Sequence, residues 1–157
     1  MNEAIEVIEK VSRWAESIGA RKKFDVSKEE VDNILSKRPS ELDTLYKSTL
    51  LDYQHILTCD ISNLNLILND LNSIIFYCDS NINYITCDSI RNMQDMMKHD
   101  LKVIAASKKD PVCSNLLKLK NQTKLKLIQL ENCIETRQKF LNMLEIVLKG
   151  KIYDRSN

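Results

Sequence analysis

The hydrophobic positions in the central third of this chain repeat at spacings of four and three residues. The row runs through Leu57, Ile61, Leu64, Leu68, Leu71, Ile75, Cys78, Ile82 and Ile85. These spacings place apolar side chains along one side of an α-helix that packs lengthwise against other helices. The row, here called the central seam, predicts a long helix from residue 41 to about residues 78–85.

A second long helix is predicted near the C-terminal end of the sequence. Asp110 followed by Pro111 is a strong start signal, because the carboxylate can cap the helix and proline at the first helical position loses no hydrogen bond. The helix is expected to span residues 111–149 and to end at Gly150. The apolar positions expected to face the central seam or a partner are Leu127, Ile134, Leu141, Leu144 and Leu148.

Shorter helices are predicted at residues 3–18, 28–37 and 89–107. Ser27 and Glu30 have the spacing of a capping box, which fixes the start of the second of these helices. Ser40 is expected to cap the long central helix. Between Asp79 and Asp88 the seam meets many side chains that compete for backbone hydrogen bonds, so we expect a break or kink there.

The composition predicts an all-α protein. Only 2 of the 157 residues are glycine and 2 are proline, which leaves little material for the tight turns of a β-rich chain. We therefore expect a single domain, residues 1–157, built as an elongated, coiled-coil-like helical bundle with two long helices and two to three shorter ones. Helices as long as those predicted exceed the dimensions of a compact domain of this size.

Charge is unevenly distributed along the chain, although the formal net charge is only +1. Residues 41–107 carry four basic and nine acidic groups, a net charge of −5, whereas residues 108–157 carry eleven basic and five acidic groups, a net charge of +6. These two segments should attract each other. Asp52, Asp60, Asp70 and Asp79 are spread along the central helix and are interpreted as a solvated face.

Five cysteines occur without any Cys-x-x-Cys pair. An odd number of cysteines on helix faces is typical of a reducing compartment, so we expect free thiols, with Cys78 and Cys133 protected by the apolar rows in which they lie. No apolar leader follows Met1, and no apolar stretch is long enough to span a membrane. These features predict an intracellular protein, cytoplasmic or nuclear, that is not secreted.

Candidate chemistry in the sequence is sparse. His55 and Cys59 are spaced by four residues, as are Asp95 and His99, and such pairs can present two metal ligands on one helical face. Neither pair has a third ligand at a recognisable spacing, and no glycine opens a phosphate-binding loop. We therefore expect no catalytic residue, metal, cofactor or small-molecule ligand.

Two function classes remain. The first is a non-enzymatic scaffold or assembly subunit of a larger complex, whose seams pack against a partner helix or a second copy, because two short N-terminal helices cannot cover two long ones along their length. The alternative is a helical nucleic-acid-binding protein or a viral host-interaction protein. Candidate phosphate contacts for that alternative are Lys118, Lys120, Lys124 and Lys126, although no aromatic residue interleaves with them. Membrane binding is not expected.

Overall fold

The computed structural model describes residues 13, 23–91, 98–107 and 110–153 of the chain. Within these ranges all regular structure is helical, which confirms the predicted all-α class. The helices are α2 (Lys28–Leu35), α3 (Pro39–Thr44), α4 (Lys47–Arg91), α5 (His99–Ser107) and α6 (Pro111–Tyr153). The predicted helix at residues 3–18 lies outside the described residues apart from Arg13, as does the start of the helix predicted at 89–107.

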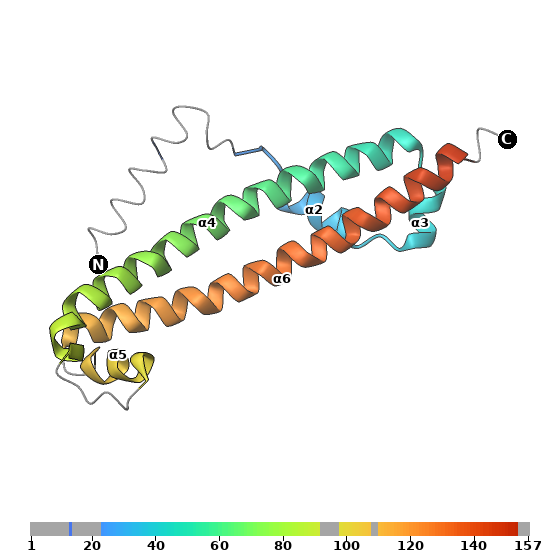
Figure 1. Ribbon diagram of the computed structural model, residues 1–157. Coiled ribbons are helices and arrows are strands. Elements are labelled where there is room, and N and C mark those ends of the chain that lie inside the picture. The colour runs from blue at the N-terminus through green and yellow to red at the C-terminus, as the bar shows by residue number, and fades with distance from the viewer. Residues whose placement is uncertain (1–12, 14–22, 92–97, 108–109, 154–157) are drawn as a thin grey trace. The chain divides into compact units, whose positions relative to one another are not determined.

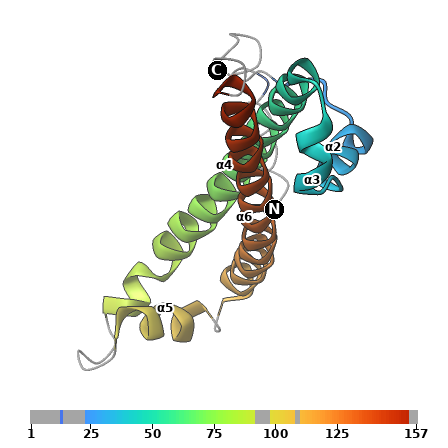
Figure 2. The same ribbon diagram turned by 90° about the vertical axis from the view of Figure 1, so that its right-hand side faces the viewer.

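The two long helices, α4 and α6, pack against each other (Figures 1 and 2). They contain 45 and 43 residues, so they are about 68 Å and 65 Å long at ~1.5 Å per residue. The chain divides into two compact units, and both long helices run through both of them. The described part of one, the α5 unit, is residues 13, 68–91, 98–107 and 110–129; that of the other, the α2–α3 unit, is residues 23–67 and 130–153. The predicted elongated shape stays a prediction.

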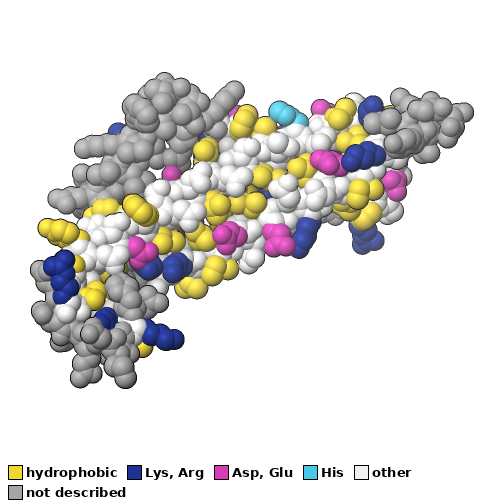
Figure 3. Space-filling view, in the orientation of Figure 1, with side chains coloured by type: hydrophobic (Ala, Val, Ile, Leu, Met, Phe, Trp, Pro, Cys, Tyr) yellow, Lys and Arg dark blue, Asp and Glu magenta, His cyan; other side chains and the backbone are white. Residues whose placement is uncertain are grey.

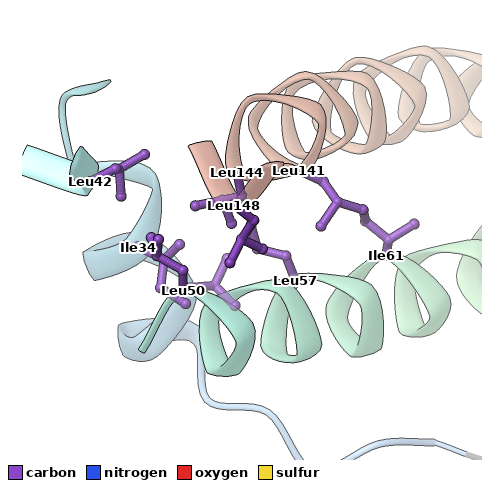
Figure 4. Close-up of a cluster of buried hydrophobic side chains, with 9 residues drawn as sticks. Ile34, Leu42, Leu50, Leu57, Ile61, Leu141, Leu144 and Leu148 are labelled. Carbon is purple, nitrogen blue, oxygen red and sulfur yellow. The ribbon is translucent and has the colours of Figure 1, made fainter. Parts of the chain in front are cut away.

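The α2–α3 unit contains a contiguous hydrophobic core to which four helices contribute (Figure 4). Its side chains have at most a tenth of their surface exposed. They are Val31, Ile34, Leu42, Leu50, Leu57, Ile61, Leu141, Leu144 and Leu148. Burying a large aliphatic side chain contributes about 1.5–3 kcal/mol relative to leaving it exposed, so this cluster holds α2 and α3 on the two long helices. Leu141, Leu144 and Leu148 therefore lie where the sequence predicted an apolar seam.

The interior of the α5 unit is built from smaller side chains. Its buried residues among those described are Cys78, Ile82, Thr86, Ala106, Cys113 and Thr123. The two threonines satisfy their hydroxyl groups within their own helices, since Thr86 Oγ1 donates to the Ile82 carbonyl at 2.7 Å and Thr123 Oγ1 donates to the Leu119 carbonyl at 2.9 Å. Among the described residues, the α5 unit thus has fewer fully buried large aliphatic side chains than the α2–α3 unit.

Two helix starts that the sequence predicted are confirmed. Ser27 Oγ accepts a hydrogen bond from the Glu30 N–H at 3.1 Å, and the Glu30 carboxylate accepts one from the Ser27 N–H at 3.1 Å, which completes the capping box of α2. Asp110 Oδ1 accepts hydrogen bonds from the backbone N–H groups of Val112 and Cys113 at 2.7 and 3.0 Å. Both signals depend only on neighbours in sequence.

The predicted start of the long central helix at residue 41 is wrong. Residues 39–44 form the separate short helix α3, with Pro39 in its first turn, and Ser40 lies inside α3 instead of capping a long helix. The backbone at Leu45 is extended, with ψ of 153°, so α4 begins at Lys47. This interruption brings Leu42 of α3 and Leu50 of α4 into the same core, where both are fully buried. Burial of both side chains therefore favours two helices over one.

The predicted break between Asp79 and Asp88 is also wrong, because α4 continues to Arg91. The alternative of a kink within a continuous helix stays a prediction. Two polar side chains of this segment bond to carbonyls of their own helix: Asn81 Nδ2 donates to the Tyr77 carbonyl at 2.8 Å, and Thr86 donates one turn back as described above. Burial of Cys78 and Ile82 supplies the packing that keeps the segment helical.

Gly150 does not end the last helix, which continues to Tyr153. Beyond the glycine, Lys151 Nζ donates a hydrogen bond to the Asp43 carbonyl at 2.6 Å. This contact joins α6 to the end of α3 one residue past the glycine that sequence rules favour as the helix stop.

Candidate protein-interaction surface

Large hydrophobic side chains are exposed mainly in the α5 unit. Of the twelve such side chains among the described residues, eight belong to this unit: Phe76, Tyr84, Ile85, Leu101, Ile104, Val112, Leu125 and Ile128. The α2–α3 unit exposes four: Tyr46, Leu51, Ile67 and Ile146. Figure 3 shows apolar side chains open to solvent on both long helices. Among the described residues, the unit with fewer buried large aliphatic side chains is thus the one with more exposed ones.

The middle of the central seam is only partly covered. Leu57 and Ile61 are buried in the α2–α3 unit, and Cys78 and Ile82 are buried in the α5 unit, whereas Ile85 is exposed. The four seam residues between them, Leu64, Leu68, Leu71 and Ile75, are half-buried, as are Leu127 and Ile134 of the facing row. The middle of the seam is therefore more accessible than the buried positions on either side of it.

A cavity of about 570 Å³ lies in the α5 unit, where α4, α5 and α6 meet. Two residues of α4 and two of α5 line it, together with four residues of α6. In chain order they are Asp79, Asn83, Val103, Ile104, Leu117, Lys120, Asn121 and Lys124. The cavity is open to solvent on one side, and its lining combines aliphatic side chains with amides and charges. A volume of this size can admit part of a ligand or the side chains of a docked helix.

An ion pair between Asp79 and Lys120 forms part of the cavity wall. In the α2–α3 unit, Arg137 makes a corresponding ion pair with Asp60, and both of these side chains are largely buried. Both pairs join the acidic α4 to the basic α6, in the direction that the charge distribution predicted. The interpretation of Asp60 as part of a solvated face is therefore wrong, whereas Asp79 remains partly exposed to solvent while it pairs with Lys120.

The four lysines singled out as candidate phosphate contacts do not form one stripe. Lys118 and Lys120 are two residues apart on α6, as are Lys124 and Lys126, and helical positions two apart do not face each other. Lys120 is engaged with Asp79, whereas the other three side chains are exposed. Lys120 and Lys124, four residues apart, share the face that lines the cavity, so the four basic groups occupy more than one face of the helix.

The cysteines divide into buried and exposed thiols. All five are free, as predicted; Cys59, Cys78 and Cys113 are buried, while Cys87 and Cys133 are exposed. Burial raises the pKa of the Cys78 thiol, and the nearby Asp79 carboxylate raises it further while Lys120 opposes the shift. Burial, and to a lesser extent the nearby Asp110 carboxylate, likewise raises the pKa of the Cys113 thiol. The expectation that Cys133 is protected is wrong, because its position on α6 points away from the core.

The structure describes only one of the two residue pairs that were considered as metal ligands. Cys59 Sγ lies 3.7 Å from His55 Nε2, so this pair does come together on α4. No group of three histidine, cysteine or acidic side chains that could hold a metal ion occurs in the described part of the chain. Asp95 and the side chain of His99 lie outside what the structure describes. None of the described helices is both long and apolar enough to cross a membrane.

The sequence analysis missed the residues that flank the cavity. Phe76 precedes Asp79 by three positions on α4, and Ile128 follows Lys124 by four on α6, so each lies one turn from a lining residue on the same helical face. Leu117, Asn121, Lys124 and Ile128 have the spacing of a helical stripe, but polar members hid that stripe from a search for purely apolar rows. The helical spacing of these four residues was the only sign of the stripe in the sequence.

No protein-family model matches this chain, and comparisons with curated proteins and with solved structures return no significant match. The case for a function therefore depends on the residues of this chain.

Proposed function

We propose that this protein is a non-enzymatic interaction subunit whose α5 unit binds another protein through its exposed apolar side chains. The observation that carries the proposal is the contrast between the two units. The α2–α3 unit buries nine core residues, whereas the α5 unit leaves eight large hydrophobic side chains exposed. Concentrations of exposed apolar surface mark sites of protein association in soluble proteins.

Aromatic side chains strengthen the proposal. Phe76 is 74% exposed and Tyr84 is 81% exposed, and both lie on α4. Aromatic residues are enriched at the energetically dominant positions of protein interfaces, because one rigid side chain buries a large apolar area. A solvated helix needs no such residues for its own stability. A partner that covers Phe76 and Tyr84 would gain the free energy of burying apolar surface that the isolated chain exposes to water.

Nucleic-acid binding has weaker support as a function of this chain. The four candidate lysines occupy more than one face of α6; Lys120 and Lys124 share a face, but Lys120 is already paired with Asp79. Binding to the phosphate backbone is strongest where basic groups form a continuous footprint. The distribution of these lysines favours association with a protein over association with nucleic acid.

The proposal is tested by tagging the protein in its source cells and measuring the mass and composition of the purified assembly. A variant with serine in place of four exposed residues of the α5 unit, Phe76, Tyr84, Leu125 and Ile128, is compared with a control that carries Tyr46→Ser and Ile146→Ser in the α2–α3 unit. All of these side chains are exposed, so both variants should fold, as circular dichroism will check.

We expect a stoichiometric protein partner with the wild type and with the control, and its loss from the four-residue variant. A wild-type protein that is purified as a monomer with nothing bound would overturn the proposal. Retention of the partner by the four-residue variant would also overturn it, because the apolar surface of the α5 unit would then be dispensable.

A further inference from the structure

We infer that the groove between α4, α5 and α6 in the α5 unit is a docking site for an amphipathic helix with acidic flanks, contributed by a partner protein. This inference rests on the proposed function and makes it specific. The groove is defined as the cavity lined by Asp79, Asn83, Val103, Ile104, Leu117, Lys120, Asn121 and Lys124, together with Phe76 and Ile128, which follow by spacing on the same faces of α4 and α6. All ten residues belong to one compact unit.

The two walls of the groove have the geometry of facing helical stripes. On α6, the residues Leu117, Asn121, Lys124 and Ile128 follow one another at steps of four, three and four, which places them in one row over about 16 Å. On α4, the residues Phe76, Asp79 and Asn83 form a second row at steps of three and four. Two parallel rows of this kind accept the apolar stripe of a third helix.

Apolar side chains lie at the positions where such a helix would be anchored. Val103 and Ile104 of α5 close part of the groove, and Leu117 lines its α6 wall. Phe76 and Ile128, which are 74% and 52% exposed, stand one turn outside the cavity on the two long helices. The helix α5 is only nine residues long, so it covers a short part of these stripes. A docked helix of two to three turns would cover the rest of these stripes, including Phe76 and Ile128.

Charge determines which kind of helix fits. Residues 111–130 of α6 contain four lysines and no acidic residue. Asp79, the acidic group of the groove, is neutralised by Lys120, which leaves Lys124 exposed on the wall without an ion-pair partner among the described residues. Complementary charge across an interface favours one partner over others, so a helix with Asp or Glu beside its apolar stripe is favoured.

The same charges disfavour a symmetric dimer through this groove. In a two-fold interface the same surface of both subunits meets, so each copy would present to the other a face of α6 that carries Lys124 and, over residues 111–130, no acidic residue. Like charges placed opposite each other cost several kcal/mol in an interface. A different, acidic helix avoids this repulsion.

The inference is tested with synthetic helical peptides of about five turns. The first peptide carries leucines at steps of three and four with glutamates on both flanks. The second has lysine in place of every glutamate, and the third has alanine in place of every leucine. Binding to the full chain is measured by fluorescence anisotropy at low salt. We expect only the glutamate–leucine peptide to bind, with a dissociation constant at least about tenfold lower than those of the other two.

Matched variants locate the binding site. Lys124→Glu should reverse the preference, so that the lysine peptide binds better than the glutamate peptide. Lys126→Glu, which makes the same charge change two residues further along α6 on a different face, should retain the original preference. Phe76→Ser combined with Ile128→Ser should weaken binding about tenfold or more, whereas Tyr46→Ser combined with Ile146→Ser should leave it unchanged.

Several results would overturn the inference that this groove binds an acidic helix. Equal binding of the glutamate and lysine peptides, or equal effects of Lys124→Glu and Lys126→Glu, would contradict the charge argument. A natural partner that is lost from the four-residue variant yet retained by Phe76→Ser with Ile128→Ser would reject this groove and leave the proposed function standing. If the wild-type assembly is a dimer of this chain and the groove forms its interface, the inference of an acidic partner helix is wrong.

Discussion

Replacement of single leucines along the central seam by alanine should show where the isolated chain covers that seam. Leu57 is fully buried in the core of the α2–α3 unit, so Leu57→Ala should lower the free energy of unfolding by about 2–5 kcal/mol. Leu68 is only half-buried. Removing its three carbons, at ~0.8 kcal/mol for each fully buried one, should cost about 1.2 kcal/mol when roughly half of that burial is present.

Urea unfolding followed by circular dichroism measures both changes. Ile146→Ala on α6 is the matched control, because its side chain is 70% exposed and its loss should change the free energy of unfolding by no more than about 0.5 kcal/mol. The dependence of the free energy on urea must stay constant among the variants for the comparison to hold. If Leu68→Ala destabilises the protein as much as Leu57→Ala does, the seam is closed in the isolated chain, and the reasoning from its partial exposure is refuted.

Three further predictions concern thiols, a helix cap and a glycine. Cys133 should react with a thiol reagent well before Cys78, whose thiol is buried and whose pKa is raised; equal labelling rates in mass spectrometry would contradict the burial of Cys78. Hydrogen bonds from the Ser27 side chain and backbone lower the pKa of Glu30, so the capping box should stabilise α2 at neutral pH and lose that contribution as pH falls through the lowered pKa. An NMR titration should show this pKa rising in Ser27→Ala, and an unchanged value would exclude the box. Gly150→Ala should raise the free energy of unfolding by about 0.5–1 kcal/mol, because an added Cβ meets nothing within 4 Å in a helical position; a decrease would show that the glycine does end α6.

Features that depend on neighbours in sequence were predictable here. Ser27 with Glu30, and Asp110 with Pro111, start helices as expected, because each cap is made by groups within three residues of one another. The two long helices were likewise evident, because their seams repeat over many turns.

Features that depend on distant contacts were not predictable. Gly150 is a strong stop signal in isolation, but Lys151 reaches the Asp43 carbonyl, more than a hundred residues away, and α6 continues. The segment after Asp79 was expected to break, yet the packing of Cys78 and Ile82 holds it in α4. Local preferences are weak enough that a few buried contacts override them.

The groove was hidden for a related reason. Its α6 wall mixes Leu117 with Asn121 and Lys124, so hydrophobic periodicity alone did not reveal it. Its α4 wall includes Asp79, which the sequence analysis interpreted as solvated. Only the placement of α5 beside both walls makes these residues one site, and no residue pattern specifies that placement.

Hydrogen exchange, measured on the protein alone and in the assembly purified from its source cells, tests the central claim most directly. We predict that binding slows amide exchange in the α5 unit, over residues 76–84 and 117–128, and leaves exchange at 50–61 and 141–148 unchanged, because the core there is already closed in the isolated chain. Slower exchange confined to the α2–α3 unit, or no change in either unit, would contradict the assignment of the partner surface to the α5 unit.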